Sequence, residues 1–324
     1  MFPPKRSSGL RRVWLPERFL ISRLSSLGDV ACSLPSAGAL KSAFPESEVV
    51  WAVDKRFAGV VRSCRHVDVV IEVKPGFKPE TWPTYEGEFD AALDLQGLLK
   101  SALAIKNAKA KVKVGYHWQR EGAWLFSERV MPDKSSLHIV DQYVDVARAV
   151  GGEAEKADFG LHPLPEALES ARAKLPTNRP FIVMNGGAGW ITKRWPPEHF
   201  AALIDRLKEC GIDSVLIGGP ADDDRRVFAE IERICRSAPG NLVGNTSIAE
   251  LIALISLAKA HVGGDTGSTH LAAALGIPAI GLYSITRPVR SCPYGQIERC
   301  CFDPSGLRNI SPDQVFQKLE EVIA

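Results

Sequence analysis

The sequence predicts two parallel α/β domains of similar size. Short β-branched runs alternate with helical patterns along the whole chain, which is typical of parallel sheets covered by helices. The length of 324 residues is too great for one ordinary core and suits two domains of about 150 residues each. Two open sheets that face each other would place a ligand in the crevice outside the carboxyl ends of their strands.

In the first half, β-branched runs predict five strands, and a helical stretch follows most of them. These strands are residues 18–23, 49–53, 67–73, 91–95 and 112–115, and the clearest helices are residues 30–44 and 139–150. Residues 74–88 form a proline- and glycine-rich insertion between two strands. Loops of this length in α/β folds either bind a ligand or are simply mobile, and the sequence favours neither interpretation.

The second half repeats the alternation. Its predicted strands are residues 181–185, 214–217, 261–263 and 279–282, and its predicted helices are residues 197–209, 222–236, 248–257 and 269–275. Two prolines near residues 160–165 mark the break between the halves. We therefore expect an N-terminal domain of residues 1–162 and a C-terminal domain of residues 163–324. The last helix is a candidate to pack back onto the N-terminal domain.

Composition excludes several classes of function. The net charge is only +2, which gives a nucleic-acid partner no global electrostatic support. No apolar run reaches the roughly 20 residues of a membrane-spanning helix, and the basic N-terminus lacks the apolar core of a secretion signal. We therefore expect a cytoplasmic protein. The seven cysteines are scattered without the spacing of a zinc site, which predicts reduced, mostly buried thiols.

The loop at residues 23–30 joins the first predicted strand to a helix. Gly28 permits a tight turn there, and Asp29 opens the helix beside the positive end of its dipole. Asp29 can be interpreted as an ordinary N-terminal cap. It can also be interpreted as a general base at the edge of the cleft, which the helix N-terminus keeps ionised and ready to accept a proton.

The loop at residues 185–196 holds three glycines in four positions and then the run Lys193-Arg-Trp-Pro. Glycines let backbone amides approach an anion closely, and Lys193 supplies a full positive charge for a phosphate. Strand-to-helix turns use glycine routinely, but the Lys-x-Trp-Pro run is much more specific. The loop is neither a Walker loop nor a dinucleotide fingerprint.

Two further loops end in glycine before a helix. After residue 217, Asp222 and Asp224 match a metal-binding D-x-D pattern, but an acidic first turn that complements the helix dipole explains them better. After Gly263, the run Asp-Thr-Gly-Ser-Thr-His places amides, hydroxyls and His270 where a diphosphate could bind. Asp265 and Ser268 alone can also be interpreted as paired helix caps.

These loops carry a family resemblance. The stretches RLSSLGDVACSLPSAGALK, TKRWPPEHFAALIDRL and GGDTGSTHLAAALGIPAIGLY resemble the hallmark segments of the ADP-heptose:lipopolysaccharide heptosyltransferases, which form glycosyltransferase family 9. FDAALDLQGLLKSAL and YHWQREGAWLF resemble heptosyltransferase I in particular. The matches occur in order over residues 18–283. The resemblance implies a GT-B fold, in which two Rossmann-like parallel-sheet domains face a central cleft.

The resemblance also implies a role for several residues. It makes Asp29 the catalytic base, and it places the acid that contacts the donor ribose near Asp222–Asp224, with Asp223 as the best match. The N-terminal domain would bind the acceptor, and the C-terminal domain would bind the donor. The implied contacts to the donor diphosphate are Lys193, Gly187, Ala188, Gly189, Asp265, Thr266, Gly267 and His270. Heptosyltransferase I often has hydroxyl residues where this chain has Gly187 to Gly189, so contacts there would come from backbone amides.

The implied reaction is an inverting, metal-independent transfer of heptose from ADP-heptose to the Kdo inner core of lipopolysaccharide, with no cofactor. An anionic Kdo–lipid A acceptor would meet basic residues of the N-terminal half, and the candidates are Arg56, Arg62, Lys100 and Arg120. Each of these is otherwise an ordinary solvated charge. The lipid implies peripheral contact with the inner face of the inner membrane, through basic and apolar surface.

Three other functions remain open. A member of the same family could use another nucleotide sugar or another acceptor, including a protein. The GT-B layout also serves sugar-nucleotide 2-epimerases. A third alternative is a non-catalytic nucleotide-sugar binder, which would need Lys193 and the 265–270 loop but has no use for a base at Asp29.

Overall fold

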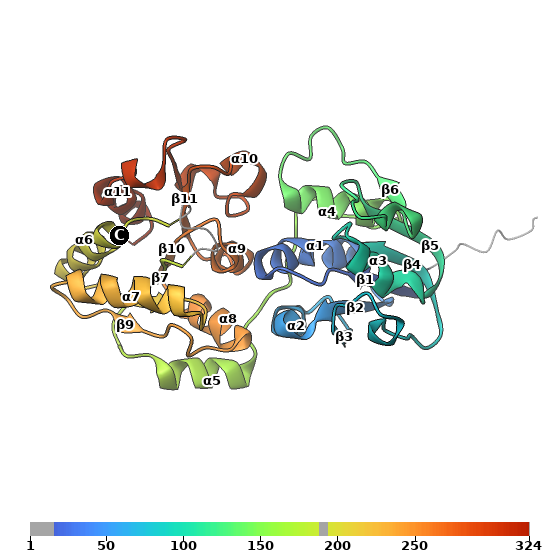
Figure 1. Cartoon of the computed structure of the whole chain (residues 1–324), viewed down its shortest axis with the longest axis horizontal. Coiled ribbons are helices and arrows are strands. Elements are labelled where there is room, and N and C mark those ends of the chain that lie inside the picture. Colours follow the sequence, from blue (N-terminus) through green and yellow to red (C-terminus); the bar gives the residue numbers. More distant parts are fainter. Residues whose placement is uncertain (1–15, 188–193, 324) are drawn as a thin grey trace, which may run out of the picture.

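The computed structural model describes residues 16–187 and 194–323, and these residues form two parallel sheets covered by helices (Figure 1). Each sheet has six strands. Short 3₁₀ turns connect several elements, at Lys55–Phe57, Pro79–Thr81, Ala123–Leu125, Ile297–Arg299 and Leu307–Asn309. The alternation of β-branched runs and amphipathic stretches therefore predicted the class of fold correctly.

The N-terminal sheet has the strand order β3-β2-β1-β4-β5-β6, and all of its paired strands are parallel. Its strands are β1 (Arg18–Ser22), β2 (Glu48–Asp54), β3 (Val69–Val73), β4 (Glu88–Asp94), β5 (Lys109–Tyr116) and β6 (Glu128–Val130). Its helices are α1 (Leu27–Ala43), α2 (Ala58–Arg62), α3 (Leu99–Lys106) and α4 (Ile139–Arg148). This order is the doubly wound, Rossmann-type arrangement.

The C-terminal sheet repeats the arrangement, with the order β12-β11-β10-β7-β8-β9. Its strands are β7 (Phe181–Asn185), β8 (Asp213–Ile217), β9 (Gly240–Asn241), β10 (Ala260–Gly264), β11 (Ala279–Tyr283) and β12 (Cys300–Phe302). Its helices are α5 (Pro165–Lys174), α6 (Pro197–Glu209), α7 (Asp222–Ile234), α8 (Ile248–Leu257), α9 (Gly267–Ala274), α10 (Pro288–Ser291) and α11 (Pro312–Ile323).

In this topology the chain reverses its winding direction next to the first strand of each sheet. Ligands bind at such switch points because the loops that follow the two adjacent strands diverge and leave a crevice. The switch points lie between β1 and β4 and between β7 and β10. Three of the four loops that the sequence singled out follow β1, β7 and β10, so the topology places them at the two crevices.

The main departures from the expected elements are short. The strands β6, β9 and β12 have two or three residues each, which is too few for an alternating pattern to be visible in the sequence. The chain passes from one sheet to the other between α4 and α5, where we place the domain boundary. Helix α11 packs on α6 and on strands β10 and β11 of the C-terminal sheet, rather than on the N-terminal domain.

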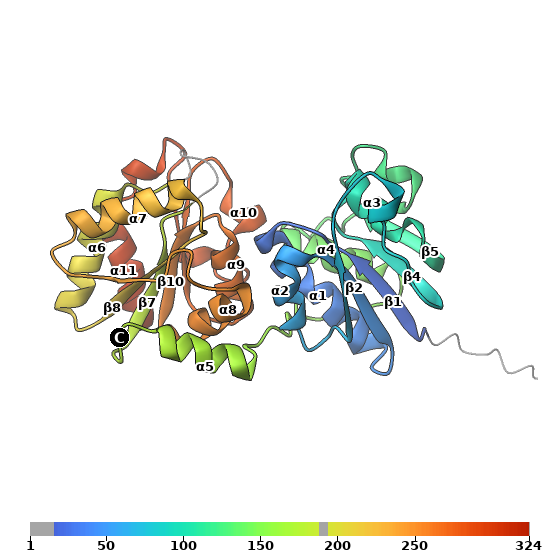
Figure 2. The same ribbon diagram turned by 60° about the horizontal axis from the view of Figure 1, so that its bottom comes forward.

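The two halves meet along helices. Figures 1 and 2 both show α1 of the N-terminal half beside α9 of the C-terminal half, and α2 also contacts α8. The contact between α1 and α9 is close because glycines occupy it. A Cβ added to Gly28 would lie 2.7 Å from Cδ2 of His270 and 3.2 Å from the Cα of Gly267. A Cβ added to Gly267 would lie 2.7 Å from the side chain of Leu27.

One continuous apolar cluster extends across this contact. It includes Leu34 and Leu40 of α1, Leu254 of α8 and Leu271 of α9, all of which are fully buried. Burial of such side chains contributes about 1.5–3 kcal/mol each relative to exposure. The two halves therefore share a hydrophobic core in addition to the cores on the outer faces of their sheets. In the part of the chain that the structure describes, no helix has the length and apolarity to cross a membrane.

The substitution Gly28→Ala tests the contact between α1 and α9. Alanine inside a helix is normally more stable than glycine by up to about 1 kcal/mol. Here the added methyl group meets the ring of His270 and the backbone of Gly267, and overpacking of this kind costs about 1–3 kcal/mol. We therefore expect a lower free energy of unfolding in urea. An increase in stability would show that the two helices are not in close contact in solution.

Candidate active site

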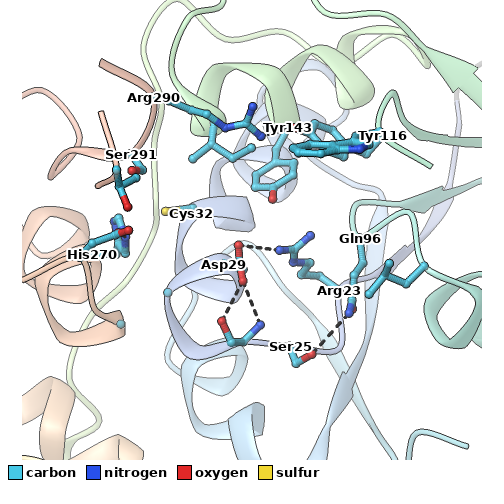
Figure 3. A pocket seen from close by; sticks show the side chains of 18 of the residues that line it. Arg23, Ser25, Asp29, Cys32, Gln96, Tyr116, Tyr143, His270, Arg290 and Ser291 are labelled. Carbon is cyan, nitrogen blue, oxygen red and sulfur yellow. Dashed lines mark hydrogen bonds and ion pairs between the residues drawn. The ribbon is translucent and has the colours of Figure 1, made fainter. Parts of the chain in front are cut away.

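A cleft of about 640 Å³ lies between the two halves, at the carboxyl ends of β1, β4 and β10. Both halves line it (Figure 3). The N-terminal side includes Arg23, Asp29, Gln96, Tyr116, Trp118 and Tyr143. The C-terminal side includes Asp265, Thr266, Gly267, His270, Arg290 and Ser291. The sequence-predicted loops at residues 23–30 and 263–270 therefore face each other across one cavity.

Arg23 follows β1 directly and is almost fully buried, with 6% of its side chain exposed. Its Nη1 donates to the backbone oxygen of Leu95 at 2.6 Å, and its Nη2 lies 2.7 Å from Oδ1 of Asp29. The ring of Tyr143 lies 5.1 Å from the guanidinium carbon. Burial lowers the pKa of Arg23, but Tyr143, Asp29 and other neighbours raise it above its ordinary value. Arg23 is therefore a fixed positive charge beneath the cleft.

Asp29 caps α1 and also lines the cleft, so its geometry is compatible with both interpretations of the sequence. Its Oδ2 accepts a hydrogen bond from the backbone N–H of Ser26 at 3.2 Å and from the Ser26 hydroxyl at 2.8 Å, so the carboxylate caps the first turn of α1. Its Oδ1 pairs with Arg23. The side chain nevertheless stays 45% exposed and lines the cleft. The cap and the ion pair hold the carboxylate group in one orientation, and Figure 3 shows both interactions.

On the opposite wall, the loop after β10 leads directly into α9. The Thr269 hydroxyl donates to the backbone oxygen of Gly264 at 2.7 Å, and Asn185 Nδ2 donates to Ser268 Oγ at 2.8 Å. These bonds join the loops after β7 and β10. Thr266 and Gly267 lie at the start of α9, where a helix favours an anion.

His270 is buried between the halves and reaches back to Asp265, with 3.4 Å between Nε2 and Oδ1. Burial lowers the pKa of His270, but the Cys32 thiol of α1 and the Asp265 carboxylate outweigh it and hold the pKa well above its usual value. Both neighbours therefore favour the protonated form of His270. It adds positive charge to the first turn of α9 and contacts α1 across the domain interface.

The loop after β7 is only partly described. Ala188, Gly189 and Lys193 lie outside the described residues, so their predicted diphosphate contacts stay predictions. Gly187 is described. Its backbone N–H donates to the side chain of Asn185 at 3.0 Å.

Asp223 and Asp224 both belong to the stretch that the resemblance matches to the ribose, but they have different surroundings. Asp224 approaches Gly187 and accepts a hydrogen bond from the N–H of Gly219 at 3.2 Å, and 20% of its side chain is exposed. Asp223 is 71% exposed and lies 3.7 Å from Arg226 on its own helix. The carboxylate that the fold places between the loops after β7 and β8 is therefore Asp224, one residue beyond the predicted Asp223.

Among the four predicted acceptor residues, only Arg120 lines the cleft. Arg56 pairs with Asp54 at 2.7 Å, and Arg62 pairs with Glu72 at 2.6 Å. Lys100 lies over the ring of Phe77, 4.9 Å from its centroid. These three cations have local partners and do not belong to the cavity.

The sequence analysis missed several cleft residues. Arg23, Tyr116 and Tyr143 were not singled out, although Arg23 and Tyr116 stand at the carboxyl ends of β1 and β5, where a parallel sheet places its ligand. Arg290 belongs to a short helix after β11 that carries no recognisable motif. Arg23 and Tyr116 could have been found from their positions at strand ends. Nothing in the sequence pointed to Arg290.

The described residues show no group of three or more histidine, cysteine or acidic side chains placed to hold a metal ion. The acidic first turn of α7 lies within those described residues. Its three aspartates lie beside the amides at the start of the helix, as the dipole interpretation predicted. All seven cysteines are free thiols.

The fold and the site define a two-domain transferase architecture, and comparison with known proteins identifies the family. Residues 85–320 match glycosyltransferase family 9 (heptosyltransferase), which covers more than half of the chain. The chain belongs to this family and is a glycosyltransferase, which confirms the resemblance that its loops carry.

Individual relatives agree. The chain is 27% identical to the lipopolysaccharide core heptosyltransferase OpsX of Haemophilus influenzae over 87% of this chain and 83% of that protein. It is 28% identical to lipopolysaccharide heptosyltransferase 1 of Escherichia coli K12 over 94% of this chain and all of that protein. The solved structure of E. coli heptosyltransferase WaaC with ADP superposes with a TM-score of 0.76 at 26% identity, covering 94% of this chain and 99% of the other. The GT-B fold is thereby confirmed.

His261 gives a pH-dependent test of the donor-side loop. It is fully buried beneath α9, and its Nε2 lies 3.0 Å from Ser268 Oγ. Burial, with a smaller contribution from His270, lowers the pKa of His261 to about 3. In the unfolded chain His261 therefore binds a proton near pH 6.5, whereas in the folded protein it stays neutral at that pH.

We expect His261 to reduce stability by about 1.4 kcal/mol for each pH unit below pH 6.5, until its folded pKa is reached. The measurement is urea unfolding of wild type and His261→Gln between pH 8 and pH 5. The wild type should lose stability relative to the variant as the pH falls. Parallel curves would mean that His261 is not held neutral in the fold.

Proposed function

We propose that this enzyme transfers heptose from ADP-heptose to the Kdo inner core of lipopolysaccharide, with inversion at the anomeric carbon and without a metal ion. One observation carries the proposal. The carboxylate of Asp29 and the first turn of α9 occupy opposite walls of a single cleft. A base on one side and an anion site on the other are what a direct displacement requires.

The donor would bind the C-terminal wall. Its diphosphate would lie at the first turn of α9, against Thr266 and Gly267 and beside the charged His270. Lys193 would add a second cation from the loop after β7. The ribose would face the loops after β7 and β8, where Asp224 lies and where the family pattern points to Asp223. The solved structure of E. coli WaaC holds ADP, which supports a nucleoside diphosphate here.

The reaction would proceed in one step. Asp29 accepts the proton of an acceptor hydroxyl while that oxygen forms a bond to the anomeric carbon, and the bond from that carbon to the diphosphate oxygen breaks. The electron pair leaves with ADP, whose new charge is stabilised by His270, by Lys193 and by helix amides. Attack from the wall opposite the leaving group inverts the configuration. Arg23 and Ser26 keep Asp29 oriented throughout.

The acceptor would be an anionic glycolipid, Kdo–lipid A, and it would bind along the N-terminal wall. Arg120 is the predicted acceptor residue that lies in the cleft. Several aromatic and aliphatic side chains near this side are exposed, including Trp118, Trp124 and Leu125. They support a peripheral contact with the inner face of the inner membrane in a cytoplasmic enzyme, as the lipid acceptor requires.

The central prediction concerns Asp29. With ADP-heptose and Kdo₂–lipid A, wild type should release ADP, whereas Asp29→Asn should lose about 100- to 10,000-fold in kcat because it cannot accept the proton. Donor affinity, measured by calorimetry with ADP, should survive. Ser26→Ala is the matched control, since it removes one hydrogen bond to Asp29 but leaves the base in place.

Four results would count against the proposal. Unchanged turnover in Asp29→Asn would remove Asp29 as the base. Equal losses in Ser26→Ala and Asp29→Asn would assign Asp29 to helix capping alone. Loss of ADP release in EDTA, restored by a divalent cation, would contradict metal independence. Donor binding without any turnover in wild type would point to a different acceptor or to a binder.

A further inference from the structure

Arg290 belongs to the C-terminal half but reaches the opposite wall of the cleft. It stands in the short helix α10, which follows β11. Its Nη2 donates to the hydroxyl of Tyr116 at 3.1 Å, and its guanidinium carbon lies 5.3 Å from the ring centroid of Trp118. Tyr116 ends β5, and Trp118 follows it, so both belong to the N-terminal half.

A second arginine approaches the same indole. The guanidinium carbon of Arg120 lies 5.5 Å from the Trp118 ring centroid. Trp118 itself is 53% exposed, and all three side chains line the cleft. Within the described parts of the chain, neither Arg120 nor Arg290 has a carboxylate within ion-pair distance. Two guanidinium groups that share one ring repel each other unless an anion joins them.

These cations also lie next to the proposed base. The hydroxyl of Tyr116 is influenced by Arg290 and by Asp29. Burial raises its pKa, Arg290 lowers the pKa, and Asp29 raises it from the other side. An anion held by Arg290 would therefore lie in the same cleft as Asp29, beside Tyr116.

We propose that Arg290, together with Arg120 across Trp118, forms an oxyanion subsite that binds a carboxylate or phosphate group of the acceptor. The identity of that acceptor rests on the proposed function, but the anion site does not. Guanidinium groups suit carboxylate and phosphate because their planar N–H donors match two oxygens at once.

The subsite makes the C-terminal half a participant in acceptor binding. Tyr116, Trp118 and Arg120 come from one half and Arg290 from the other, so the site is complete only while the halves are in contact. An acceptor that binds there stabilises the closed arrangement, in which Asp29 faces the first turn of α9. Binding of acceptor and donor should therefore be positively coupled.

The first experiment detects the anion site without any acceptor. Fluorescence of Trp118, obtained as the difference between wild type and Trp118→Phe, is quenched with iodide and with neutral acrylamide at constant ionic strength. Two nearby cations concentrate iodide at the ring. Arg290→Gln should lower the iodide quenching constant at least twofold and leave acrylamide quenching unchanged. Arg287→Gln, an exposed arginine three residues earlier that does not line the cleft, is the matched control.

The second experiment identifies the anion. Arg290→Gln should raise the KM for Kdo₂–lipid A about tenfold while kcat and the KM for ADP-heptose change little, and Arg290→Lys should recover part of the loss. Wild type is then assayed with acceptor whose Kdo carboxylates are methyl esters, and with dephosphorylated acceptor. One of these two modifications should raise the KM for the acceptor in wild type but not in Arg290→Gln. The group that this modification blocks or removes is the one that Arg290 binds.

The two experiments separate the subsite from the proposed function. If wild type shows no turnover but iodide quenching depends on Arg290, the anion site stands and the proposed acceptor is wrong. If iodide quenching is the same in wild type, Arg290→Gln and Arg287→Gln, the anion site is overturned. Reduced quenching with an unchanged acceptor KM would overturn its assignment to the acceptor.

Discussion

The close approach of α1 to α9 is the constraint on which the site depends. At Gly28 and Gly267 the absence of side chains lets the first turns of two helices from different sheets come together. Each first turn follows a strand beside a switch point, so this contact merges two crevices into one cavity. A side chain at either glycine would separate Asp29 from the start of α9. The motifs around residues 28 and 267 thus have a packing role in addition to any chemical one.

The two walls of the cavity carry opposite charge. On the N-terminal side, the buried Arg23 holds Asp29 as an oriented anion. On the C-terminal side, the start of α9 favours an anion, and Cys32 and Asp265 favour the protonated form of His270. His270 also contacts Cys32 of α1, so the first turn of α9 is linked to the helix that carries Asp29. A displacement reaction needs this opposition, with a proton acceptor facing a group that stabilises the leaving anion.

Much of this arrangement could be predicted from the sequence. Strand and helix periodicity gave the two sheets, and glycine-bearing loops after strands gave the walls of the cleft, because parallel strands end at a common edge. The choice between Asp223 and Asp224 could not be made that way. Neighbouring residues on a helix point about 100° apart, so a shift of one position exchanges the exposed Asp223 for the more buried Asp224.

The arginines of the cleft were harder to predict from the sequence. Arg56 and Arg62 carry the right charge, but only the structure shows that each already pairs with an acid outside the cavity. Arg290 lies far from the N-terminal wall in sequence, and its contact with Tyr116 arises only from the packing of the two halves. Sequence patterns report local structure well. They do not report which long side chains meet across a domain interface.

The most direct test of the account is a crystal structure with the non-transferable donor ADP-2-deoxy-2-fluoro-heptose. The account predicts the diphosphate at the first turn of α9 and the anomeric carbon facing Asp29. An acceptor oxygen within hydrogen-bond reach of the base and about 3–3.5 Å from the reacting carbon allows at most about 7 Å between the carboxylate and that carbon. A donor bound away from α9, or an anomeric carbon that faces away from Asp29, would contradict the account.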